Sequence, residues 1–153
     1  MRVLRAEVLG LCFGVRDALA MTASVERPEE VAIHGELIHN PLVALTLEAR
    51  GFHLPTGPER PDLPDQSVVL ITAHGISDRE RDRLISAGKT LIDTTCSLVR
   101  RAHQAAIKLR DEGYYVIVIG RRNHVEVIGL TGDLHGFECV ETLERFTFVW
   151  HTI

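Results

Sequence analysis

The sequence predicts an α/β fold built from parallel β-sheets. Apolar runs of strand length alternate with helix-like stretches along almost the whole chain, and this alternation is typical of βαβ units. Two of the runs, at 67–75 and 114–120, are nearly uninterrupted, as in strands that are buried on both faces of a sheet. A length of 153 residues suits one ordinary domain or two small lobes that share a surface.

Each element is predicted from its own local pattern. In chain order, the predicted strands lie at 2–9, 31–33, 67–75, 89–94, 114–120 and 146–153, and the predicted helices at 16–26, 41–50, 78–87 and 97–112. Asn40 followed by Pro41 marks a helix start, because asparagine caps a helix and proline is tolerated at the first helical position. Residues 55–66 contain four prolines and are predicted to form a connecting loop. Residues 123–132 are expected to open a turn or short helix.

Composition excludes several classes of protein. Lys and Arg number 17 against 21 Asp and Glu, for a net charge of −4, whereas nucleic-acid binders usually carry a basic surplus. No apolar run is long enough to span a membrane, and no signal-peptide pattern is visible. We therefore expect a cytoplasmic protein with neither a nucleic-acid nor a membrane partner. The three cysteines, Cys12, Cys96 and Cys139, are an odd number at wide spacing and predict no disulfide framework.

Reactive side chains recur where predicted strands give way to helices, which is where parallel α/β sheets place their working residues. Each of five successive strand ends carries a cysteine, histidine or glutamate near a glycine or asparagine. These residues are Cys12, the segment from His34 to His39, His74, Cys96, and His124 with Glu126. The recurrence is the most informative feature of the sequence taken by itself.

Three interpretations of Cys12 and Cys96 remain open from the residues alone. A free cysteine is often a small buried apolar residue. At a helix N-terminus, however, the helix dipole and the unpaired amide N–H groups favour a thiolate. Such a thiolate suits a nucleophile or a ligand of zinc or an iron–sulfur cluster. Because the two cysteines are far apart and no CxxC motif exists, spacing does not choose among the three.

The histidines and Glu126 follow a similar logic. A lone histidine is more often structural than functional, but imidazolium groups at His39, His74 and His124, with loop amides, would form an anion pocket suited to phosphate. Glu126 lies among apolar neighbours, which favours the neutral carboxyl of a proton donor, unless it is simply exposed on a helix. His103 lies two helical turns after Cys96 and either supports the site or belongs to the core. The remaining three, His53, His135 and His151, are expected to be ordinary loop or surface residues.

Five segments together resemble a known family. They are "LGLCFGVRDA", "GELIHNPLV", "TAHGIS", "DTTCSLVRRAH" and "NHVEVIGLTG". In order and spacing they are similar to the N-terminal half of the LytB-type 4-hydroxy-3-methylbut-2-enyl diphosphate reductases, the terminal enzymes of the non-mevalonate isoprenoid pathway. The resemblance implies a trefoil of three α/β lobes around a 4Fe-4S iron–sulfur cluster held by three cysteines, with the third lobe missing here.

The resemblance also implies roles for individual residues. Cys12 and Cys96 match the first two cluster ligands, and Glu126 matches the acid that delivers protons as the allylic hydroxyl leaves. The histidines that match those around the substrate diphosphate are His39, His74 and His124. The implied reaction is a reductive dehydroxylation of an isoprenoid diphosphate that yields isopentenyl and dimethylallyl diphosphate. Its implied electron donor is of the flavodoxin or ferredoxin type.

The sequence departs from the family pattern in two ways. Ser97 stands where the family has a proline, which is a tolerable change at a helix start. The family's chains are about twice as long, and the segment around Cys139 does not match the third-ligand motif. We expect 1–13 to form the N-terminal strand and first ligand loop, 14–96 the first lobe, and 97–153 an incomplete second lobe. Three explanations would account for the length: a truncated piece, an interrupted reading frame, or half of a split protein whose other half is a second chain.

Two other functions compete with this one. The first is a non-catalytic protein that binds diphosphates and has lost the cluster. The second is a zinc hydrolase that uses Cys12, Cys96 and one histidine, although the sequence has no compact zinc motif such as HExxH. Iron, zinc or the absence of both would distinguish the three readings.

Overall fold

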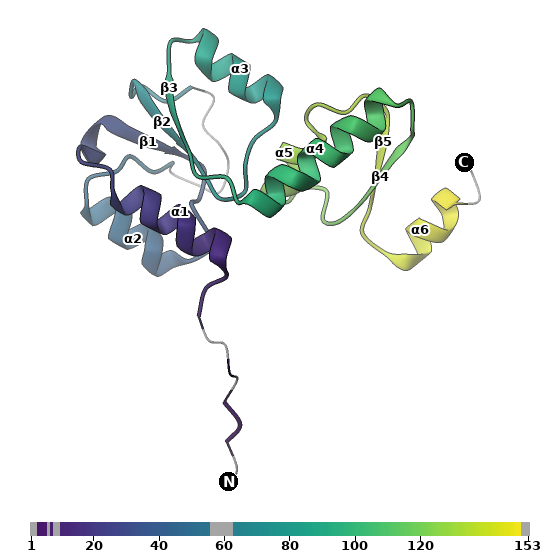
Figure 1. The fold of residues 1–153 in the computed structure, drawn as a ribbon, viewed down its shortest axis with the longest axis horizontal. Helices are drawn as coiled ribbons and strands as arrows, with labels where there is room; N and C mark the ends of the chain where they lie inside the picture. Colours follow the sequence, from purple (N-terminus) through teal and green to yellow (C-terminus); the bar gives the residue numbers. More distant parts are fainter. Residues whose placement is uncertain (1–2, 6, 8–9, 56–62, 151–153) are drawn as a thin grey trace.

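The computed structural model of the protein describes residues 3–5, 7, 10–55 and 63–150, and helices and strands alternate along it (Figure 1). The helices are α1 (Phe13–Ala23), α2 (Pro41–Ala49), α3 (Asp78–Ser86), α4 (Ser97–Asp111), α5 (Val125–Thr131) and α6 (Leu143–Trp150), with a short 3₁₀ helix at Pro28–Glu30. The strands are β1 (Val31–His34), β2 (Val68–Ile71), β3 (Thr90–Asp93), β4 (Val116–Ile119) and β5 (Phe137–Val140). The α/β class with parallel sheets is therefore confirmed.

The first sheet contains β1, β2 and β3 in that order, and all of its strands are parallel. Val68 of β2 pairs with Val31 of β1 and with Thr90 of β3. Parallel strands in register end at one edge of the sheet. The loops that follow β1, β2 and β3 therefore start side by side.

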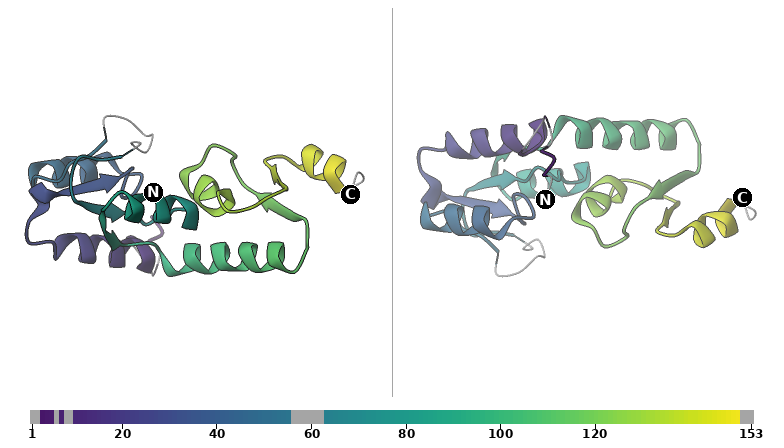
Figure 2. Two further views of the ribbon diagram at one scale, coloured as in Figure 1. Left: turned by 90° about the horizontal axis from the view of Figure 1, so that it is seen from above. Right: turned by 90° about the horizontal axis from the view of Figure 1, so that it is seen from below.

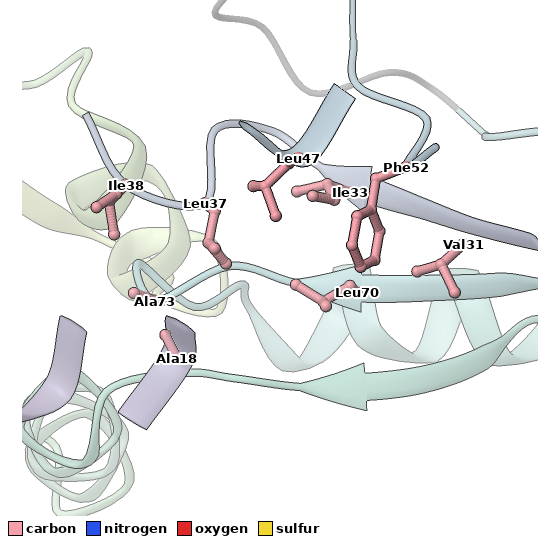
Figure 3. Packing of buried hydrophobic residues seen from close by; sticks show 9 residues of the cluster. All are labelled: Ala18, Val31, Ile33, Leu37, Ile38, Leu47, Phe52, Leu70 and Ala73. Carbon is pink, nitrogen blue, oxygen red and sulfur yellow. The ribbon is translucent and has the colours of Figure 1, made fainter. Parts of the chain in front are cut away.

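Helices cover both faces of this sheet. Leu70 of β2 packs into a core with Ala18 of α1 and Leu47 of α2, whereas its neighbours in sequence contact Leu84 of α3 on the opposite face. The alternation is the two-residue period of a strand whose faces are both buried. Figure 3 shows Leu47 and Phe52 pointing toward the strand residues Ile33 and Leu70.

The second sheet contains β4 and β5, which are parallel. Helix α4 runs from the end of β3 toward this sheet, and Figure 2 shows it lying alongside α5 and the strands. Ala106 of α4, Val116 of β4 and Leu134 form the buried centre of a small core. The same helix thus links the two sheets.

Local signals place the helix starts. The Asn40 side chain accepts the amide N–H of Leu42 at 3.0 Å, with Pro41 in the first turn, as predicted. The Ser77 hydroxyl accepts the amide N–H of Glu80 at 3.1 Å and caps α3 in the same way. Each cap follows a strand of the first sheet, so these turns lie near its carboxyl edge.

Two sequence-based expectations about elements were wrong, and one strand was missed. Residues 3–5, inside the predicted strand 2–9, form no strand, and residues 2, 6, 8 and 9 lie outside the described residues. Residues 143–150 form helix α6, where the predicted strand 146–153 begins. Strand β5 was not predicted. Of the proline-rich loop, residues 56–62 also lie outside the described residues.

Over the described part of the chain, none of the helices has both the length and the apolar character needed to cross a lipid bilayer.

Candidate functional site

Backbone hydrogen bonds continue beyond the strand ends and hold three loops together. The amide N–H of Ala73 donates to the Leu37 carbonyl at 3.4 Å, and the amide N–H of Cys96 donates to the Ala73 carbonyl at 3.0 Å. His39 lies two residues after Leu37, and His74 directly follows Ala73. These hydrogen bonds hold the loops after β1, β2 and β3 side by side. This is the arrangement predicted from candidate residues at the ends of parallel strands.

Three imidazole rings meet at this edge. The ring centroids of His39 and His74 are 4.5 Å apart, those of His39 and His124 are 5.2 Å apart, and those of His74 and His124 are 5.7 Å apart. His39 comes from the β1–α2 loop, His74 from the β2–α3 loop and His124 from the N-terminus of α5. Residues separated widely in sequence thus form one cluster, which we call the histidine cluster.

Hydrogen bonds link the rings of this cluster to one another and to neighbouring groups. His39 Nδ1 lies 2.7 Å from Glu36 Oε2 and therefore donates its proton to the carboxylate. His124 Nδ1 accepts the amide N–H of Glu126 at 3.3 Å, so in the neutral ring its proton is on Nε2. His39 Nε2 and His124 Nε2 are 3.3 Å apart, and the second donates to the first. The ring nitrogens of His39 and His124 are thus linked to each other, to Glu36 and to the start of α5.

Glu126 lies beside the cluster in the first turn of α5. Its Oε2 is 3.9 Å from His74 Nδ1, and its side chain is 44% exposed, whereas that of His74 is 13% exposed. The expectation of apolar surroundings for Glu126 is therefore only partly met. The carboxyl group can reach both the solvent and a molecule bound at the imidazole rings.

Gly75 allows α5 to approach the β2–α3 loop. Its φ of +68° is a conformation that side-chain-bearing residues rarely adopt, and a Cβ there would come within 2.8 Å of the Thr95 methyl group. On the other side, a Cβ added at Gly129 of α5 would lie 3.3 Å from the Gly75 carbonyl oxygen. This close packing brings His124 and Glu126 to the first sheet.

The two candidate ligand cysteines lie at helix N-termini that touch one another. Cys12 is the N-cap residue of α1 and Cys96 that of α4. Neither cysteine side chain forms a capping hydrogen bond to its own helix. A helix N-terminus is in general a setting that favours metal-binding thiolates. A Cβ added at Gly14, in the first turn of α1, would overlap Cys96 Sγ and lie 3.0 Å from its Cβ. Two thiols with this dipolar support fit a thiolate-bound metal group.

Asp93 shapes the turn that carries Cys96, and sequence analysis missed it. Its Oδ1 accepts the Thr95 amide N–H at 3.0 Å and the Thr95 hydroxyl at 2.5 Å. Arg81 donates to its other oxygen at 2.7 Å, and Arg100 lies 3.4 Å away. Burial raises the pKa of Asp93, but Thr95 and Arg81 outweigh burial and hold the pKa below its ordinary value. The sequence signal was the Asp-x-Thr pattern of a side-chain-capped turn.

The other histidines lie away from the cluster. His34 is fully buried, with Nε2 3.0 Å from Glu80 Oε1, and His53 Nε2 bonds the Glu29 carbonyl at 2.8 Å. His103 Nε2 lies 2.8 Å from Asp133 Oδ2, and the His103 side chain is 13% exposed. His135 is exposed, and His151 lies outside the described residues.

Cys139 is a structural residue of β5. It is 3% exposed, and its thiol donates to the Gly120 carbonyl at 3.2 Å. Burial raises the pKa of this thiol, which disfavours the thiolate that a metal ligand requires. The geometry agrees with the mismatch between its sequence surroundings and a third-ligand motif.

Two cavities flank the histidine cluster. One of about 570 Å³ lies between the β1–α2 loop and α2. Its lining residues are Glu36, Ile38, His39, Asn40, Pro41, Ala44, Leu45 and Glu48. The other, of about 340 Å³, lies between α3, α4 and α5, and His74 is in its wall. A molecule held by the three rings therefore has open volume on both sides.

Comparisons with known proteins show which family the chain resembles. Residues 3–147 match the family model described as "LytB protein". The chain is similar to a protein of Pseudothermotoga lettingae, 37% identical over 133 residues, and to one of Aquifex aeolicus, 36% identical over 148 residues. Both are named 4-hydroxy-3-methylbut-2-enyl diphosphate reductase, and the matches cover 86% and 93% of this chain.

Solved structures of such reductases have a similar fold. One, described as the terminal enzyme of the non-mevalonate pathway, has a TM-score of 0.74 and 35% identity, and the match covers 90% of this chain and 50% of that one. The reductase of Plasmodium falciparum has a TM-score of 0.78 and 30% identity, with 90% and 44% covered.

The resemblance inferred from five sequence segments is confirmed by these matches. The chain spans about half the length of the curated relatives it matches, 48% and 50% for the two bacterial proteins. The match to the family model, in contrast, extends over almost the whole chain. The chain belongs to the LytB family.

Proposed function

We propose that the chain supplies the substrate-binding and proton-donating part of a 4-hydroxy-3-methylbut-2-enyl diphosphate reductase. The reaction is a reductive dehydroxylation that forms isopentenyl and dimethylallyl diphosphate, the last step of the non-mevalonate pathway. Two electrons and two protons are consumed, the C–O bond breaks, and the hydroxyl group leaves as water. The single observation that carries the proposal is the meeting of His39, His74 and His124 beside Cys96.

The histidine cluster suits the diphosphate of such a substrate. Each ring presents an N–H group or takes up a proton to present one, and imidazolium N–H groups bind phosphate oxygens through charge-assisted bonds. The pair formed by His39 Nε2 and His124 Nε2 has one proton between two nitrogens when both rings are neutral. An anion between them would favour a second proton, so binding would be stronger at lower pH.

Glu126 is the proposed proton donor to the leaving hydroxyl group. Its carboxyl oxygen lies 3.9 Å from His74 Nδ1, within reach of a molecule that the rings hold. Its exposed fraction of 44% lets solvent return the proton after each turnover. A carboxyl group in this position is a suitable general acid.

Cys12 and Cys96 are the proposed ligands of a 4Fe-4S cluster. When bound, such a cluster supplies low-potential electrons and a Lewis-acidic iron for the hydroxyl oxygen. The role of this chain is to stabilise the two thiolates at the starts of α1 and α4 and to orient the substrate through the histidine cluster. Family resemblance implies a third cysteine, and Cys139 does not fit that role because it is buried in β5.

We further propose that residues outside these 153 complete the site, a second chain being one source of the missing lobe. Within the chain, 1–13 would form the first ligand loop, 14–96 the first lobe of a trefoil and 97–153 part of the second. A flavodoxin- or ferredoxin-type protein would deliver the electrons one at a time in the cytoplasm.

Metal analysis tests this proposal. The protein is purified without oxygen, and its iron, acid-labile sulfide and zinc contents are measured with its EPR spectrum after reduction. We expect iron and sulfide in similar amounts, lost in Cys12→Ser and Cys96→Ser. Cys139→Ser is the matched control and should keep its iron, because that thiol bonds a carbonyl inside β5. Zinc in place of iron, or equal iron loss in all three variants, would contradict the proposal.

A second candidate function is diphosphate binding without a cluster. It is favoured by a difference between the two groups of candidate residues. The three rings meet within one chain, whereas the proposed ligand Cys12 is exposed. A colourless protein that binds inorganic pyrophosphate, with affinity lost in His74→Ala, would support this function over the reductase.

A further inference from the structure

The carboxylate of Asp133 reaches from the α5–β5 turn to the start of α3. One oxygen accepts the amide N–H of Asp78 at 2.6 Å, and the other accepts that of Arg79 at 2.9 Å. Asp133 therefore caps a helix that begins more than fifty residues earlier in the chain. Its side chain is only 9% exposed.

Asp133 completes the capping of α3. The Ser77 hydroxyl accepts the amide N–H of Glu80, which leaves the N–H groups of Asp78 and Arg79 for the Asp133 carboxylate. The unpaired amides of a first helical turn attract a carboxylate through both hydrogen bonding and the helix dipole. Because the acceptor belongs to a distant segment, the cap is also a link between two parts of the molecule.

Two further contacts hold Asp133 in place. His103 Nε2 of α4 lies 2.8 Å from Asp133 Oδ2, and Arg110 Nη1 donates to the Asp133 carbonyl at 2.6 Å. Burial raises the pKa of Asp133. The hydrogen bonds from the amides of Arg79 and Asp78 and from His103 outweigh burial, so the pKa lies below its ordinary value. The group is thus ionised when it caps α3. Both Asp133 oxygens thus accept N–H groups of α3.

Two glycines near Asp133, Gly129 and Gly132, let their segment pack closely against residues 75–77. A Cβ added at Gly132 would lie 2.6 Å from Ser77 Cβ and 2.8 Å from its hydroxyl oxygen, and Gly129 is similarly close to the Gly75 carbonyl. The contact thus extends from Gly129 of α5 to Asp133, just after the end of that helix. Its other side is the 75–79 segment, which directly follows His74.

We propose that Asp133 is a positioning residue that holds α5, and with it His124 and Glu126, against the loop that carries His74. This inference rests on the proposed function, because it assumes that the histidine cluster binds a diphosphate. The hydrogen bonds of Asp133 go to the start of α3 and to two residues of α4, His103 and Arg110. Asp133 acts by fixing the helix whose first turn carries two of the site's side chains.

The test compares Asp133→Asn with Asp82→Asn. Asp133→Asn turns one acceptor into an NH₂ donor that faces an amide N–H of α3, whereas Asp82→Asn makes the same charge change at an exposed position of α3. Two quantities are measured: calorimetric affinity for inorganic pyrophosphate, and amide hydrogen exchange of residues 125–131 with 68–71 as an internal reference. Exchange at 68–71 reports whether the first sheet is intact, so a general loss of folding is recognised.

We expect Asp133→Asn to weaken pyrophosphate binding by about tenfold and to speed exchange at 125–131, with 68–71 unchanged. Asp82→Asn should match the wild type in both. Unchanged affinity, or reduced affinity with unchanged exchange at 125–131, would overturn the inference. If Asp133→Asn does not fold, Gly132→Ala carries the same test, because its Cβ would push α5 away from Ser77 without altering a charge.

The proposed function and the inference can fail separately. If wild-type protein bound no pyrophosphate, the proposed function would fail, and exchange at 125–131 alone would decide the inference. Faster exchange in Asp133→Asn would then still support the positioning of α5 by Asp133. Equal exchange in the two variants would overturn it.

Discussion

At the scale of single residues, His124 has two hydrogen bonds that depend on its protonation. Its Nδ1 accepts the Glu126 amide N–H and so caps α5, and its Nε2 faces His39. A doubly protonated ring has no acceptor nitrogen. Full protonation of His124 would therefore remove the cap of α5, which is why the second proton of the cluster is better placed on His39, beside Glu36.

Pyrophosphate binding should take up a proton. The charged groups that face the rings are Glu36 and Glu126, and a bound diphosphate adds negative charge that favours the imidazolium form of His39. We therefore expect proton uptake on binding, and weaker binding as the pH rises. Calorimetry in two buffers of different ionisation enthalpy measures the uptake directly.

His124→Asn separates the two tasks of that residue. Asparagine is a favourable N-cap residue, so α5 should stay capped while the ring and its proton are lost. We expect pyrophosphate binding to weaken by about 1.5–3 kcal/mol and the proton uptake to shrink. His135→Asn, at an exposed histidine outside the cluster, is the control. Proton uptake that stays the same in His124→Asn would contradict the shared-proton description.

Glu126→Gln tests the proton donor. We expect turnover to fall by about 10²–10⁴-fold, with iron and sulfide contents unchanged, because Glu126 is proposed to give a proton and not to bind metal. Turnover is measured on the iron-loaded protein with a chemical one-electron reductant, in the presence of whatever chain completes the site. Glu144→Gln, at an exposed position of α6, should retain full activity. Normal turnover in Glu126→Gln would show that another group supplies the proton.

At the scale of elements, the site depends on how turns after strands are closed. Asp93 ends β3 and fixes the turn before α4 through Thr95, while Arg81 of α3 holds its other oxygen. The carboxylate thus ties two helices to the turn that carries Cys96. The Gly14 contact with Cys96 adds α1 to the same junction.

Asp93→Asn should lower the free energy of unfolding by about 1–3 kcal/mol at neutral pH, because it removes charge-assisted hydrogen bonds from a partly buried site. The pKa of Asp93 is lowered in the folded protein, so its stabilising contribution is present above the ordinary carboxyl pKa of about 4 and is lost as the pH falls through the lowered value. The difference between wild type and variant should therefore shrink below about pH 4. Urea unfolding at pH 3 and pH 7 measures the difference in unfolding free energy between wild type and variant. The same difference at both pH values would contradict the stabilising role of the ionised Asp93.

Gly14→Ala should disturb the junction of α1 and α4. The added methyl group overlaps Cys96 Sγ, so we expect a loss of about 1–3 kcal/mol in stability, as for overpacking of a close contact. In the double variant with Cys96→Ala, removal of the sulfur atom should restore part of that loss. Thermal unfolding of the single and double variants gives the coupling. Additive losses would mean that the two side chains do not meet.

Much of this element structure was predictable from local sequence. Asn40 with Pro41 places the start of α2, and the apolar runs place β2 and β4 within a few residues. Strand β5 was missed because four residues, "FECV", give too short a pattern to recognise. Helix α6 was mistaken for a strand because Phe, Val, Trp and Thr favour strands, although Thr142, which accepts the Arg145 amide N–H at 3.3 Å, was a capping signal. Residues 3–5 are strand-like in sequence, but a strand forms only where a neighbour pairs with it.

At the scale of the whole molecule, the site lies where α5 packs against a loop of the first sheet. His39 and His74 come from loops of the first sheet, and His124 and Glu126 come from α5, which packs between α4 and the β2–α3 loop. The six candidate residues could be proposed from the sequence because each lies at a strand or helix end. The sequence did not identify Asp133 or Glu36, because their roles depend on contacts across the fold that no local pattern records.

The central claim is that Cys12 and Cys96 bind one iron–sulfur group beside the histidine cluster. The most direct measurement is a crystal structure of the anaerobically purified, iron-loaded protein with an anomalous difference map at the iron absorption edge. We expect one compact iron peak bonded to both Sγ atoms and facing His74 and His124. An iron peak at only one of the two cysteines, or at Asp78, His103 and Asp133 instead, would contradict the claim.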